Sequence, residues 1–325
     1  MLEVRDLEVS FPTRRGTVHA LRGVGFSIEP RQVVGLVGES GSGKSVTASA
    51  IIGLIRPPGR VTAGDVLWNG RSLLEDQYID AVRAKGIALI PQEPTWSLNP
   101  LAKIGRQLEE VLRYHRGLGG AEARSAALEL LDAVEIPAAR RCASQYPFEL
   151  SGGMCQRVLI ALALVSEPDL IIADEPTSSL DVTIQKQIIE LISKLRDQWG
   201  LSMLFITHDL GLVAEVCDSV IVMYSGLILE SGNVSEVFGD PSHPYTAALL
   251  RSRPVVSVGQ RRLPAIAGSP PNALAPPQGC PFHPRCEFAE TLCEVQRPAL
   301  LTGVNDGGSV ACWKPLNRLD EHHHR

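Results

Sequence analysis

The segment GESGSGKS at positions 38–45 constrains the fold of this chain more than any other feature of its sequence. It matches the pattern G-x-x-x-x-G-K-[ST]. An apolar strand over residues 32–37 precedes it, and the helical pattern VTASAIIGLI follows it. This strand–loop–helix context is the one in which the pattern binds phosphate. The sequence therefore predicts a phosphate loop within an α/β domain.

The chemistry of this loop follows from its residue types. Gly41 and Gly43 allow the backbone to curl so that its N–H groups point at phosphate oxygens, and the N-terminus of the following helix adds positive potential. We expect Lys44 to reach the β- and γ-phosphates of ATP and the Ser45 hydroxyl to ligate Mg²⁺. The loop residues assigned to nucleotide binding are Gly38, Ser40, Gly41, Ser42, Gly43, Lys44 and Ser45.

A second motif, LIIADEPT, places two acids at the end of an apolar run. A buried strand over residues 170–173 delivers Asp174 to its C-terminal end, where the carboxylate can organise Mg²⁺, and Glu175 can polarise the attacking water. Alone this pattern is weak, because strands often end in solvated acids. In a chain that carries a phosphate loop, it predicts a catalytic pair that hydrolyses the γ-phosphate.

The length and patterning of the chain predict one large domain with an appendage, because 325 residues exceed an average domain. Residues 1–35 alternate like a β-hairpin, and three helical patterns fill the region from Leu98 to about Ser166. Strand and helix patterns then alternate as far as Gly239. Beyond that residue the sequence is proline-rich from Pro264 to Pro277, which is typical of a boundary or an extended segment.

Charge and hydropathy narrow the classes of partner. The formal net charge is −5 and no basic stripe is present, so the sequence does not predict a nucleic-acid partner. The N-terminus lacks the basic-then-apolar order of a signal peptide. The apolar run from Val158 to Val165 is far shorter than the roughly 20 residues that a membrane span needs. A membrane role must then come through partner subunits.

Between the two motifs lies the text LSGG, at residues 150–153, followed by Met154. It resembles the LSGGQ signature of ATP-binding-cassette (ABC) proteins, and the resemblance covers residues 1 to about 240. It implies an α/β, ABC-type phosphate-loop NTPase over residues 1–239, with a RecA-like core, an antiparallel β subdomain and a helical subdomain at about 98–166. Met154 departs from the usual glutamine. Because Ser151, Gly152 and Gly153 are intact, we expect a functional signature.

The resemblance assigns further residues in the expected order. Phe11 stands where the family stacks an aromatic ring on adenine, and Gln92 matches the glutamine that ligates Mg²⁺ and senses the transmembrane subunits. Asp181 matches the loop that follows the catalytic acid, and His208 the histidine that contacts the γ-phosphate. Each has a plainer interpretation: Phe11 as an ordinary strand aromatic, Gln92 as a solvated loop residue and His208 as a polar residue at a helix N-terminus.

The family also implies how the cassette is used. The signature of one subunit meets the γ-phosphate of ATP held by a second subunit, so that two ATP molecules lie in a head-to-tail dimer. We expect the second ATPase subunit to be a paralogue. With both Glu175 and His208 present, this chain is expected to contribute a hydrolysis-competent half-site.

The last part of the chain, residues 240–325, resembles the C-terminal region of dipeptide, oligopeptide and nickel importer ATPases. The text that carries this resemblance is HPYT, a proline-rich stretch and then GCPFHPRCEFAETLC. It implies an ATPase that powers import of peptides or a related small solute, with nickel as an alternative. The implied partners are two transmembrane permeases and an extracytoplasmic solute-binding protein. The implied location is the cytoplasmic face of the inner membrane, as a peripheral subunit.

Two other classes of ABC protein fit the sequence less well. A soluble ABC ATPase that remodels DNA or ribosomes usually has two cassettes or a long coiled-coil insertion, and this chain has neither. An exporter motor usually lacks such a cysteine-containing tail. The tail is therefore the feature that favours an importer.

Four of the seven cysteines crowd this C-terminal region with the spacing C-x5-C-x6-C-x18-C, and they are Cys280, Cys286, Cys293 and Cys312. Four thiolates suit either a [4Fe–4S] cluster or a tetrahedral zinc site. The lack of short C-x2-C pairs favours iron–sulfur, and the resemblance strengthens that choice. Free or disulfide-linked cysteines are the alternative. We expect the cluster to staple the extension rather than to act in redox chemistry, and His283 to be structural.

Overall fold

The computed structural model describes residues 1–75, 77–252, 266–304 and 308–316. The chain divides into two compact units. The first consists of Met1–Ser27, Val34–Leu73 and Thr207–Arg325, and the second of Ile28–Val33 and Leu74–Ile206. Of the predicted C-terminal extension, Pro264 and the rest of 253–265, residues 305–307 and the tail from 317 lie outside the described residues.

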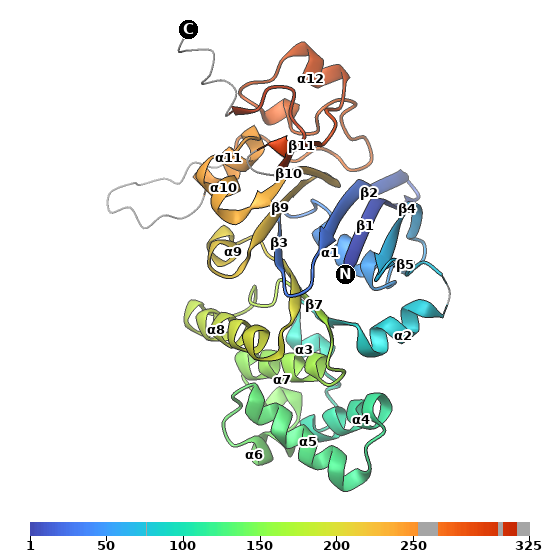
Figure 1. Ribbon diagram of the computed structural model, residues 1–325, viewed down its shortest axis with the longest axis vertical. Coiled ribbons are helices and arrows are strands. Elements are labelled where there is room, and N and C mark those ends of the chain that lie inside the picture. The colour runs from blue at the N-terminus through green and yellow to red at the C-terminus, as the bar shows by residue number, and fades with distance from the viewer. Residues whose placement is uncertain (76, 253–265, 305–307, 317–325) are drawn as a thin grey trace. The chain divides into compact units, whose positions relative to one another are not determined.

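The first sheet of the first unit is antiparallel and has the strand order β2-β1-β4-β5 (Figure 1). Its strands are β1 (Leu2–Thr13), β2 (Gly16–Ile28), β4 (Arg60–Trp68) and β5 (Arg71–Ser72). Alternating apolar residues of β1, among them Leu2 and Val4, are buried, as expected when one face of a strand covers a core. The hairpin predicted for the N-terminus is confirmed.

The second sheet of this unit is mixed, with β3 parallel to β9 and antiparallel pairs beyond it in the order β9-β10-β12-β11. Its strands are β3 (Val33–Val37), β9 (Ser219–Tyr224), β10 (Leu227–Asn233), β11 (Leu301–Val304) and β12 (Gly308–Val310). The unit's helices are α1 (Lys44–Ile51), α9 (Leu210–Val216), α10 (Val234–Gly239), α11 (Pro244–Arg251) and α12 (Thr291–Val295), with a 3₁₀ turn at His283–Arg285.

One hydrophobic core joins the two sides of the boundary predicted near Gly239. Tyr245 and Phe282 pack in the same buried cluster as Val37 and Val222, which belong to β3 and β9. Strand β12 also pairs with β10 along Glu230 and Ser231. The C-terminal segment therefore shares its core with the strand that leads into the phosphate loop.

The second unit holds three parallel strands, β6 (Ile87–Ile90), β7 (Leu170–Asp174) and β8 (Ser202–Ile206), paired in the order β6-β7-β8. The strand β8 is buried throughout, and β7 is buried up to Asp174. Such continuous apolar runs are typical of parallel strands covered on both faces. The helices at the strand connections are α2 (Tyr78–Lys85), α3 (Pro94–Ser97) and α8 (Val182–Trp199).

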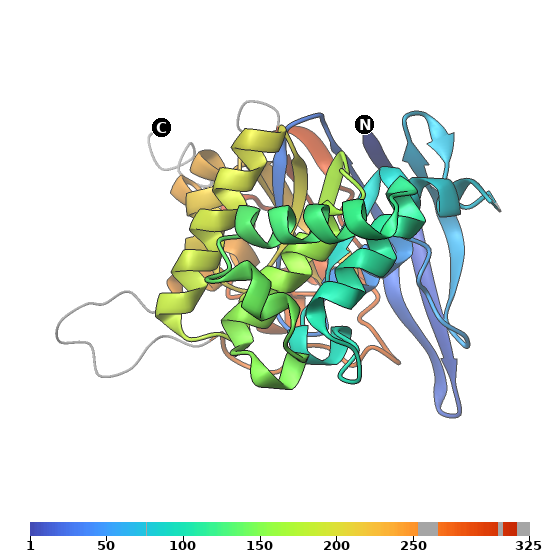
Figure 2. The same cartoon turned by 90° about the horizontal axis from the view of Figure 1, so that it is seen from below.

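The other helices of this unit form a group that Figures 1 and 2 show side by side. They are α4 (Ile104–Arg116), α5 (Gly120–Ala133), α6 (Ala139–Ala143) and α7 (Gly152–Leu164), with a 3₁₀ turn at Pro147–Glu149. The amphipathic helix α4 buries Leu108 and Leu112. It ends at Arg116, and its C-cap residue Gly117 has a φ of 67°, the left-handed conformation that glycine favours. The three helices predicted here are confirmed, and α6 was not predicted.

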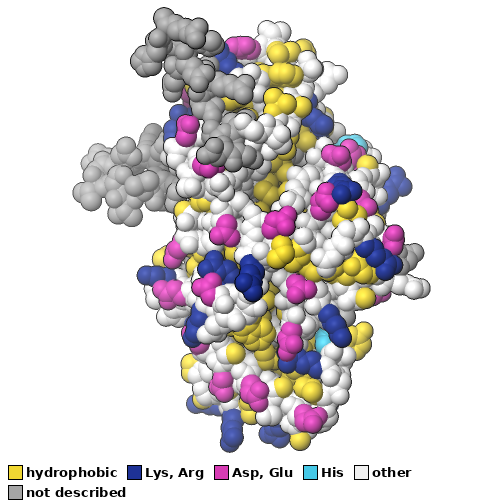
Figure 3. Space-filling view, in the orientation of Figure 1, with side chains coloured by type: hydrophobic (Ala, Val, Ile, Leu, Met, Phe, Trp, Pro, Cys, Tyr) yellow, Lys and Arg dark blue, Asp and Glu magenta, His cyan; other side chains and the backbone are white. Residues whose placement is uncertain are grey.

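Two surface features bear on possible partners. Basic and acidic side chains are interspersed on the face seen in Figure 3, without a continuous basic stripe among the described residues there. Within the described ranges, none of the helices is both long enough and apolar enough to cross a membrane.

Candidate active site

The phosphate loop connects β3 to α1, and its backbone depends on glycine. Gly38, Gly41 and Gly43 have φ angles of 151°, 78° and 110°, a range that other residues rarely adopt. A side chain at Gly43 would also stand 2.9 Å from Leu21 Cδ2. Gly41 and Gly43, which were predicted to let the loop curl, therefore have backbone conformations that produce the curl.

Lys44 begins α1 and lies on the loop. Its side chain is buried, and Nζ donates hydrogen bonds to the carbonyl oxygens of Gly38 and Glu39 at 2.8 and 3.2 Å. A cation at a helix N-terminus, beside the N–H groups of a curled loop, is an arrangement suited to a polyphosphate. Of the other loop residues predicted to bind nucleotide, Ser42 is buried, whereas Ser40, Gly41 and Ser45 are exposed.

Two more predicted residues belong to the same unit. The segment before His208 is tied to β3, because Thr207 N–H donates to Leu36 O at 3.3 Å. The histidine itself is exposed. Phe11 is half-buried, and its ring lies so close to Gly59 that a side chain there would overlap the ring. The structure thus holds His208 beside the strand that leads into the loop and places Phe11 against a turn.

In the second unit, the two acids lie at the C-terminal end of β7, as predicted. Asp174 is the last residue of the strand, and both acids are half-buried. Glu175 has a φ of 46°, a left-handed conformation uncommon outside glycine, and its N–H donates to Ile206 O at 2.9 Å. Its Oε2 accepts a hydrogen bond from Gln92 Nε2 at 3.4 Å. The structure therefore brings Gln92 and Glu175 together.

The signature forms the start of helix α7. Ser151 is the N-cap residue, and its Oγ accepts a hydrogen bond from the N–H of Met154 at 3.3 Å. Ser151 and Gly152 are exposed. A side chain at Gly153 would stand 2.6 Å from Ile184 Cγ2 in α8. Glycine is required there because the two helices approach closely, and the exposed N-terminus of α7 can accept an anion.

Asp181, predicted for nucleotide binding, caps helix α8. Its Oδ1 accepts hydrogen bonds from the N–H groups of Thr183 and Ile184, both at 3.1 Å. The exposed carboxylate thus fixes the start of the helix that packs on the signature.

The predicted site residues therefore form two sets. The phosphate loop, Phe11 and His208 lie in the first unit, and Gln92, Asp174, Glu175, the signature and Asp181 lie in the second.

Sequence reasoning gave no role to three residues that contact one another at the phosphate loop. The carboxylate of Glu39 pairs with Arg285 at 2.6 and 3.0 Å, and the N–H of Glu39 donates to the Tyr245 hydroxyl at 2.9 Å. The signal was present in the sequence, since Tyr245 lies in HPYT and Arg285 in CPFHPRC. These two motifs gave no indication that the side chain of Tyr245 or Arg285 reaches the phosphate loop.

The four C-terminal cysteines line one small cavity of about 20 Å³, together with His243, His283 and Trp313. The N–H of Cys280 donates to Cys293 O at 2.8 Å, which ties the segments of the two residues together. No disulfide joins any of the chain's cysteines, all of which lie in the described ranges. The predicted thiols are therefore gathered in the folded chain and remain as free thiols.

Burial controls the protonation of these thiols. Desolvation raises the pKa of Cys280 to about 11 and the pKa of Cys312 to about 12, and it also raises the pKa of Cys286. Among the described residues, no group of three or more histidine, cysteine, aspartate or glutamate side chains is placed to hold a single metal ion.

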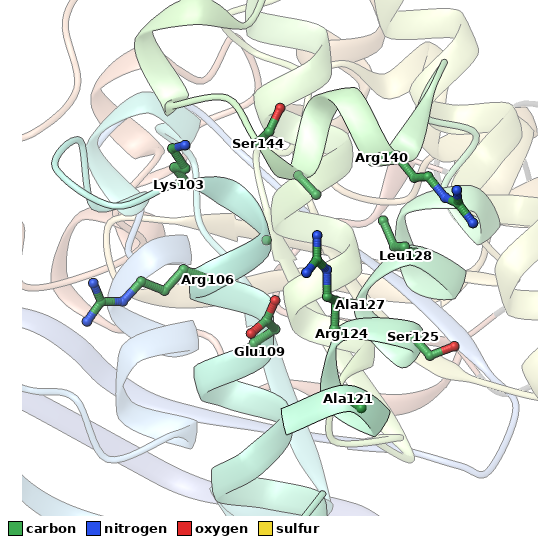
Figure 4. Close-up of a pocket in the computed structure, with 12 residues that line it drawn as sticks. Lys103, Arg106, Glu109, Ala121, Arg124, Ser125, Ala127, Leu128, Arg140 and Ser144 are labelled. Carbon is green, nitrogen blue, oxygen red and sulfur yellow. The ribbon is translucent and has the colours of Figure 1, made fainter. Parts of the chain in front are cut away.

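A second cavity, of about 610 Å³, lies among helices α4, α5 and α6. Figure 4 shows Glu109 and Arg124 directed toward the same part of it, with Lys103, Arg106 and Arg140 around its rim. None of the predicted site residues lines this cavity, and we assign it no catalytic role.

A curled glycine loop with its lysine, and an acid pair that follows a parallel strand, define a phosphate-loop ATPase. Comparison with known proteins agrees. The family model described as "ABC transporter" matches residues 21–178, and the model described as "Oligopeptide/dipeptide transporter, C-terminal region" matches residues 229–293. A third, described as "AAA domain, putative AbiEii toxin, Type IV TA system", matches residues 143–214 within the same cassette.

Relatives match nearly the whole chain. The oligopeptide transport ATP-binding protein OppD of Salmonella typhimurium is 44% identical over 98% of this chain and 95% of its own length. OppD of Bacillus subtilis is 47% identical over 96% of this chain and 88% of its own length. The solved dimer of the ATP-binding cassette MJ0796 in a post-hydrolysis state, bound to ADP and Pi, has a TM-score of 0.65 and 29% identity, and covers 72% of this chain and 99% of that chain.

The cassette fold and its ATPase activity are thereby established for this chain. It belongs to the ABC transporter ATP-binding proteins, in the group that contains the OppD oligopeptide transport ATP-binding proteins.

Proposed function

We propose that this chain uses its ATPase activity to power the import of dipeptides, oligopeptides or a related small solute. The observation that carries the proposal is the union, in one chain, of an ABC cassette with the C-terminal region of oligopeptide/dipeptide transporters. The relatives named for oligopeptide transport match 98% and 96% of the chain, so the resemblance is not confined to the cassette.

The residues of the first unit bind the nucleotide in this proposal. The curled N–H groups of the phosphate loop and Lys44 hold the phosphates, Ser45 ligates Mg²⁺, and Phe11 stacks on adenine. The positive φ angles of Gly38, Gly41 and Gly43 support this role, because a curled backbone can turn its N–H groups toward a bound phosphate. His208 contacts the γ-phosphate, and its place beside β3 supports that role.

The residues of the second unit carry the hydrolytic step. Glu175 polarises the attacking water, Asp174 organises Mg²⁺ and Gln92 ligates it. The contact between Gln92 and Glu175 supports this assignment, because it joins the metal ligand to the base. Bound Mg²⁺ supplies charge neutralisation at the phosphates.

The signature serves a second ATPase subunit. Ser151, Gly152 and Gly153 present an exposed helix N-terminus, which suits the γ-phosphate of ATP bound by a partner in a head-to-tail dimer. That partner is a paralogue of this chain, with a second copy of the same chain as the alternative. Asp181 fixes the start of the neighbouring helix and so acts beside the nucleotide interface.

The remaining partners in this proposal are two transmembrane permeases and an extracytoplasmic solute-binding protein. The chain is then a peripheral subunit at the cytoplasmic face of the inner membrane. Nucleic acid is not a partner. Import of nickel or another solute is the alternative substrate class, because the same C-terminal resemblance extends to nickel importers.

The cysteine cavity holds a [4Fe–4S] cluster in this proposal, with Cys280, Cys286, Cys293 and Cys312 as ligands. The four thiols line one cavity, and no disulfide consumes them. A tetrahedral zinc site on the same thiolates is the alternative. The cluster supplies a cross-link that stabilises the C-terminal segment.

Solute uptake tests the transport proposal. Cells that lack this chain are expected to lose uptake of labelled oligopeptides and to regain it with the wild-type chain but not with Glu175→Gln. Loss of nickel uptake with peptide uptake intact would move the assignment to the alternative substrate. If both uptakes are intact, the importer proposal is wrong.

Metal analysis tests the cysteine proposal. Protein purified anaerobically is expected to be brown, to absorb at about 400 nm and to contain about four irons and four acid-labile sulfides per chain. The substitution Cys286→Ser is expected to abolish both. Stoichiometric zinc, or a chain without metal, would contradict the cluster.

A further inference from the structure

The phosphate loop is anchored to the C-terminal segment through one residue, Glu39. Its carboxylate accepts hydrogen bonds from both Nη atoms of Arg285, at 2.6 and 3.0 Å. Its N–H donates to the hydroxyl of Tyr245, and its carbonyl accepts from Lys44 Nζ. Every polar group of this loop residue is therefore held, two of them by residues that follow the cassette in sequence.

The arginine is built into the protein interior. Only 4% of its side chain is exposed, and every nitrogen of the guanidinium has an acceptor. Besides Glu39, the acceptors are the hydroxyl of Tyr224 at 3.0 Å and the carbonyls of Ala267 and Ile266 at 2.9 and 3.3 Å. Lysine cannot replace a planar guanidinium whose three nitrogens all donate hydrogen bonds. The hydrogen bonds to Glu39 are the main reason that the pKa of Arg285 is raised above its usual value.

The position of Arg285 is fixed by the cysteine-bearing segment. Arg285 ends the 3₁₀ turn between Cys280 and Cys286, and both cysteines line the small cavity. Phe282, in the same segment, packs on Tyr224 and Tyr245 with ring centroids 5.5 and 5.2 Å apart. The guanidinium that contacts the loop is therefore carried by the segment that bears Cys280 and Cys286.

We infer that Arg285 is a positioning residue of the ATPase reaction, which holds Glu39, and with it the phosphate loop, in the shape that binds ATP. Arg285 also neutralises a carboxylate in a loop that receives a polyanion. Removing the arginine leaves an unpaired, half-buried negative charge beside the incoming phosphates, and this opposes ATP binding. The inference rests on the proposed role of residues 38–45 as the ATP phosphate site.

Equilibrium binding of a fluorescent ATP analogue with Mg²⁺ to the full chain tests the inference. Arg285→Gln is expected to raise the Kd about tenfold. Arg285→Lys is expected to raise it by less, because lysine keeps the positive charge but lacks the planar guanidinium that binds both carboxylate oxygens. Glu39→Gln/Arg285→Gln is expected to bind more tightly than Arg285→Gln alone, because the unpaired carboxylate is gone. Steady-state hydrolysis is expected to show a higher KM with a smaller change in kcat.

Controls separate this inference from the proposed ATP site. Arg251→Gln removes an exposed ion pair between α11 and the cysteine-bearing segment, in which Arg251 and Glu287 stand 3.8 Å apart, and is expected to bind like wild type. Lys44→Ala is expected to lose binding. If Lys44→Ala loses binding while Arg285→Gln stays within about twofold of wild type, the inference is wrong and the ATP site stands. If Lys44→Ala binds normally, both are wrong.

A folding defect can also be recognised. If Arg285→Gln does not fold, Arg285→Lys and Glu39→Gln/Arg285→Gln carry the test, each at a matched fraction of folded protein by circular dichroism. Equal Kd values for the wild type, Arg285→Lys and the double variant would then overturn the inference. A raised Kd for Arg285→Lys that the double variant partly reverses supports it.

Discussion

The side-chain amide of Gln92 lies 3.4 Å from the carboxylate of Glu175. The two residues come from different loops, one after β6 and one after β7, which are paired parallel strands. The carboxyl ends of neighbouring parallel strands meet at one edge of the sheet, so loops far apart in sequence can share a site there. A shift of the loop that contains Gln92 therefore bears directly on the proposed base.

Replacing the proposed base is the most direct test of the hydrolytic site. Glu175→Gln keeps the size of the side chain and removes its ability to accept a proton from water. We expect kcat for ATP hydrolysis to fall by about 10²–10⁴-fold while ATP affinity is unchanged or tighter. The rate of phosphate release and the Kd of ATP, measured on the same preparation, check this.

Glutamine at this position is also expected to trap the ATP-bound closed state of the dimer. Size-exclusion chromatography with MgATP measures that state directly. Undiminished hydrolysis in Glu175→Gln would remove Glu175 from the catalytic role and leave the fold assignment unaffected.

The close approach of α7 to α8 gives a second prediction. Gly153→Ala places a methyl group 2.6 Å from Ile184 Cγ2, so either the start of α7 or the Ile184 side chain of α8 must shift, which disturbs the contact beside the signature. We expect destabilisation of about 1–3 kcal/mol and loss of ATP-driven dimerisation. Urea unfolding and light scattering with MgATP measure the two effects.

A compensating substitution supplies the control for this prediction. Ile184→Ala removes the methyl group that the added side chain at position 153 would strike. The double variant Gly153→Ala/Ile184→Ala is therefore expected to regain dimerisation relative to Gly153→Ala. If the double variant is no better than the single one, contact with Ile184 is not the reason that glycine is needed.

The cap of helix α8 can be tested on its own. Asp181→Ala deletes the acceptor for two backbone N–H groups and is expected to lower the free energy of unfolding by about 1 kcal/mol. Asp181→Asn keeps an acceptor and is expected to cost less. If Asp181→Asn and Asp181→Ala are equally stable, capping is not what Asp181 contributes.

The reactivity of the two buried cysteines of the helical region depends on pH. Burial raises the pKa of Cys142 to about 11 and also raises the pKa of Cys155. At pH 8 the thiolate of Cys142 is then a fraction of about 10⁻³, and only the thiolate reacts with iodoacetamide. We expect both cysteines of the folded protein to react far more slowly at pH 8 than they do in the unfolded chain. The modification rate of Cys142 is expected to rise about tenfold per pH unit from pH 8 to 10, as its thiolate fraction rises.

Mass spectrometry of digested protein locates the label. Protein unfolded in urea is the control and is expected to be labelled at both cysteines. Labelling of either one at pH 8 at the rate of the unfolded chain would contradict their burial.

The inferred link between the cysteine segment and the phosphate loop gives a last prediction. Cys286→Ala alters the residue that follows Arg285 and removes a thiol from the cavity. We expect a rise of about fivefold or more in the Kd of ATP. Exposed Lys314, which pairs with Glu290 at 2.8 Å, is the matched position, and Lys314→Gln is expected to bind normally.

The Kd of the fluorescent ATP analogue measures this effect, with metal content recorded for each preparation. An unchanged Kd in folded Cys286→Ala protein would show that the cavity does not influence the loop.

Much of the fold was predictable from short stretches of sequence. The phosphate loop, the acids after β7, the helices α4, α5 and α7 and the hairpin of β1 and β2 were all predicted, and the structure has each of them. Such elements depend on the conformation of consecutive residues and on the period with which apolar residues recur. Glycine at positions 38, 41 and 43 indicates the loop because few other residues adopt its φ angles.

Sequence patterns did not predict the contacts that join distant parts of the chain. Glu39 and Arg285 are 246 positions apart, and Gln92 and Glu175 are 83 positions apart. No period or local propensity relates residues at such separations, because their distance depends on the path of the whole chain. For the same reason the sequence marked a boundary near Gly239, although Tyr245 and Phe282 pack in a core with Val37.

The sequence by itself thus determined the class of chemistry, since phosphate binding needs particular backbone conformations and residue types within a few consecutive positions. Only the tertiary structure decided which residues hold that loop in place. A buried arginine needs an acceptor for each N–H, and folding brings Glu39, Tyr224 and the carbonyls of residues 266 and 267 to Arg285.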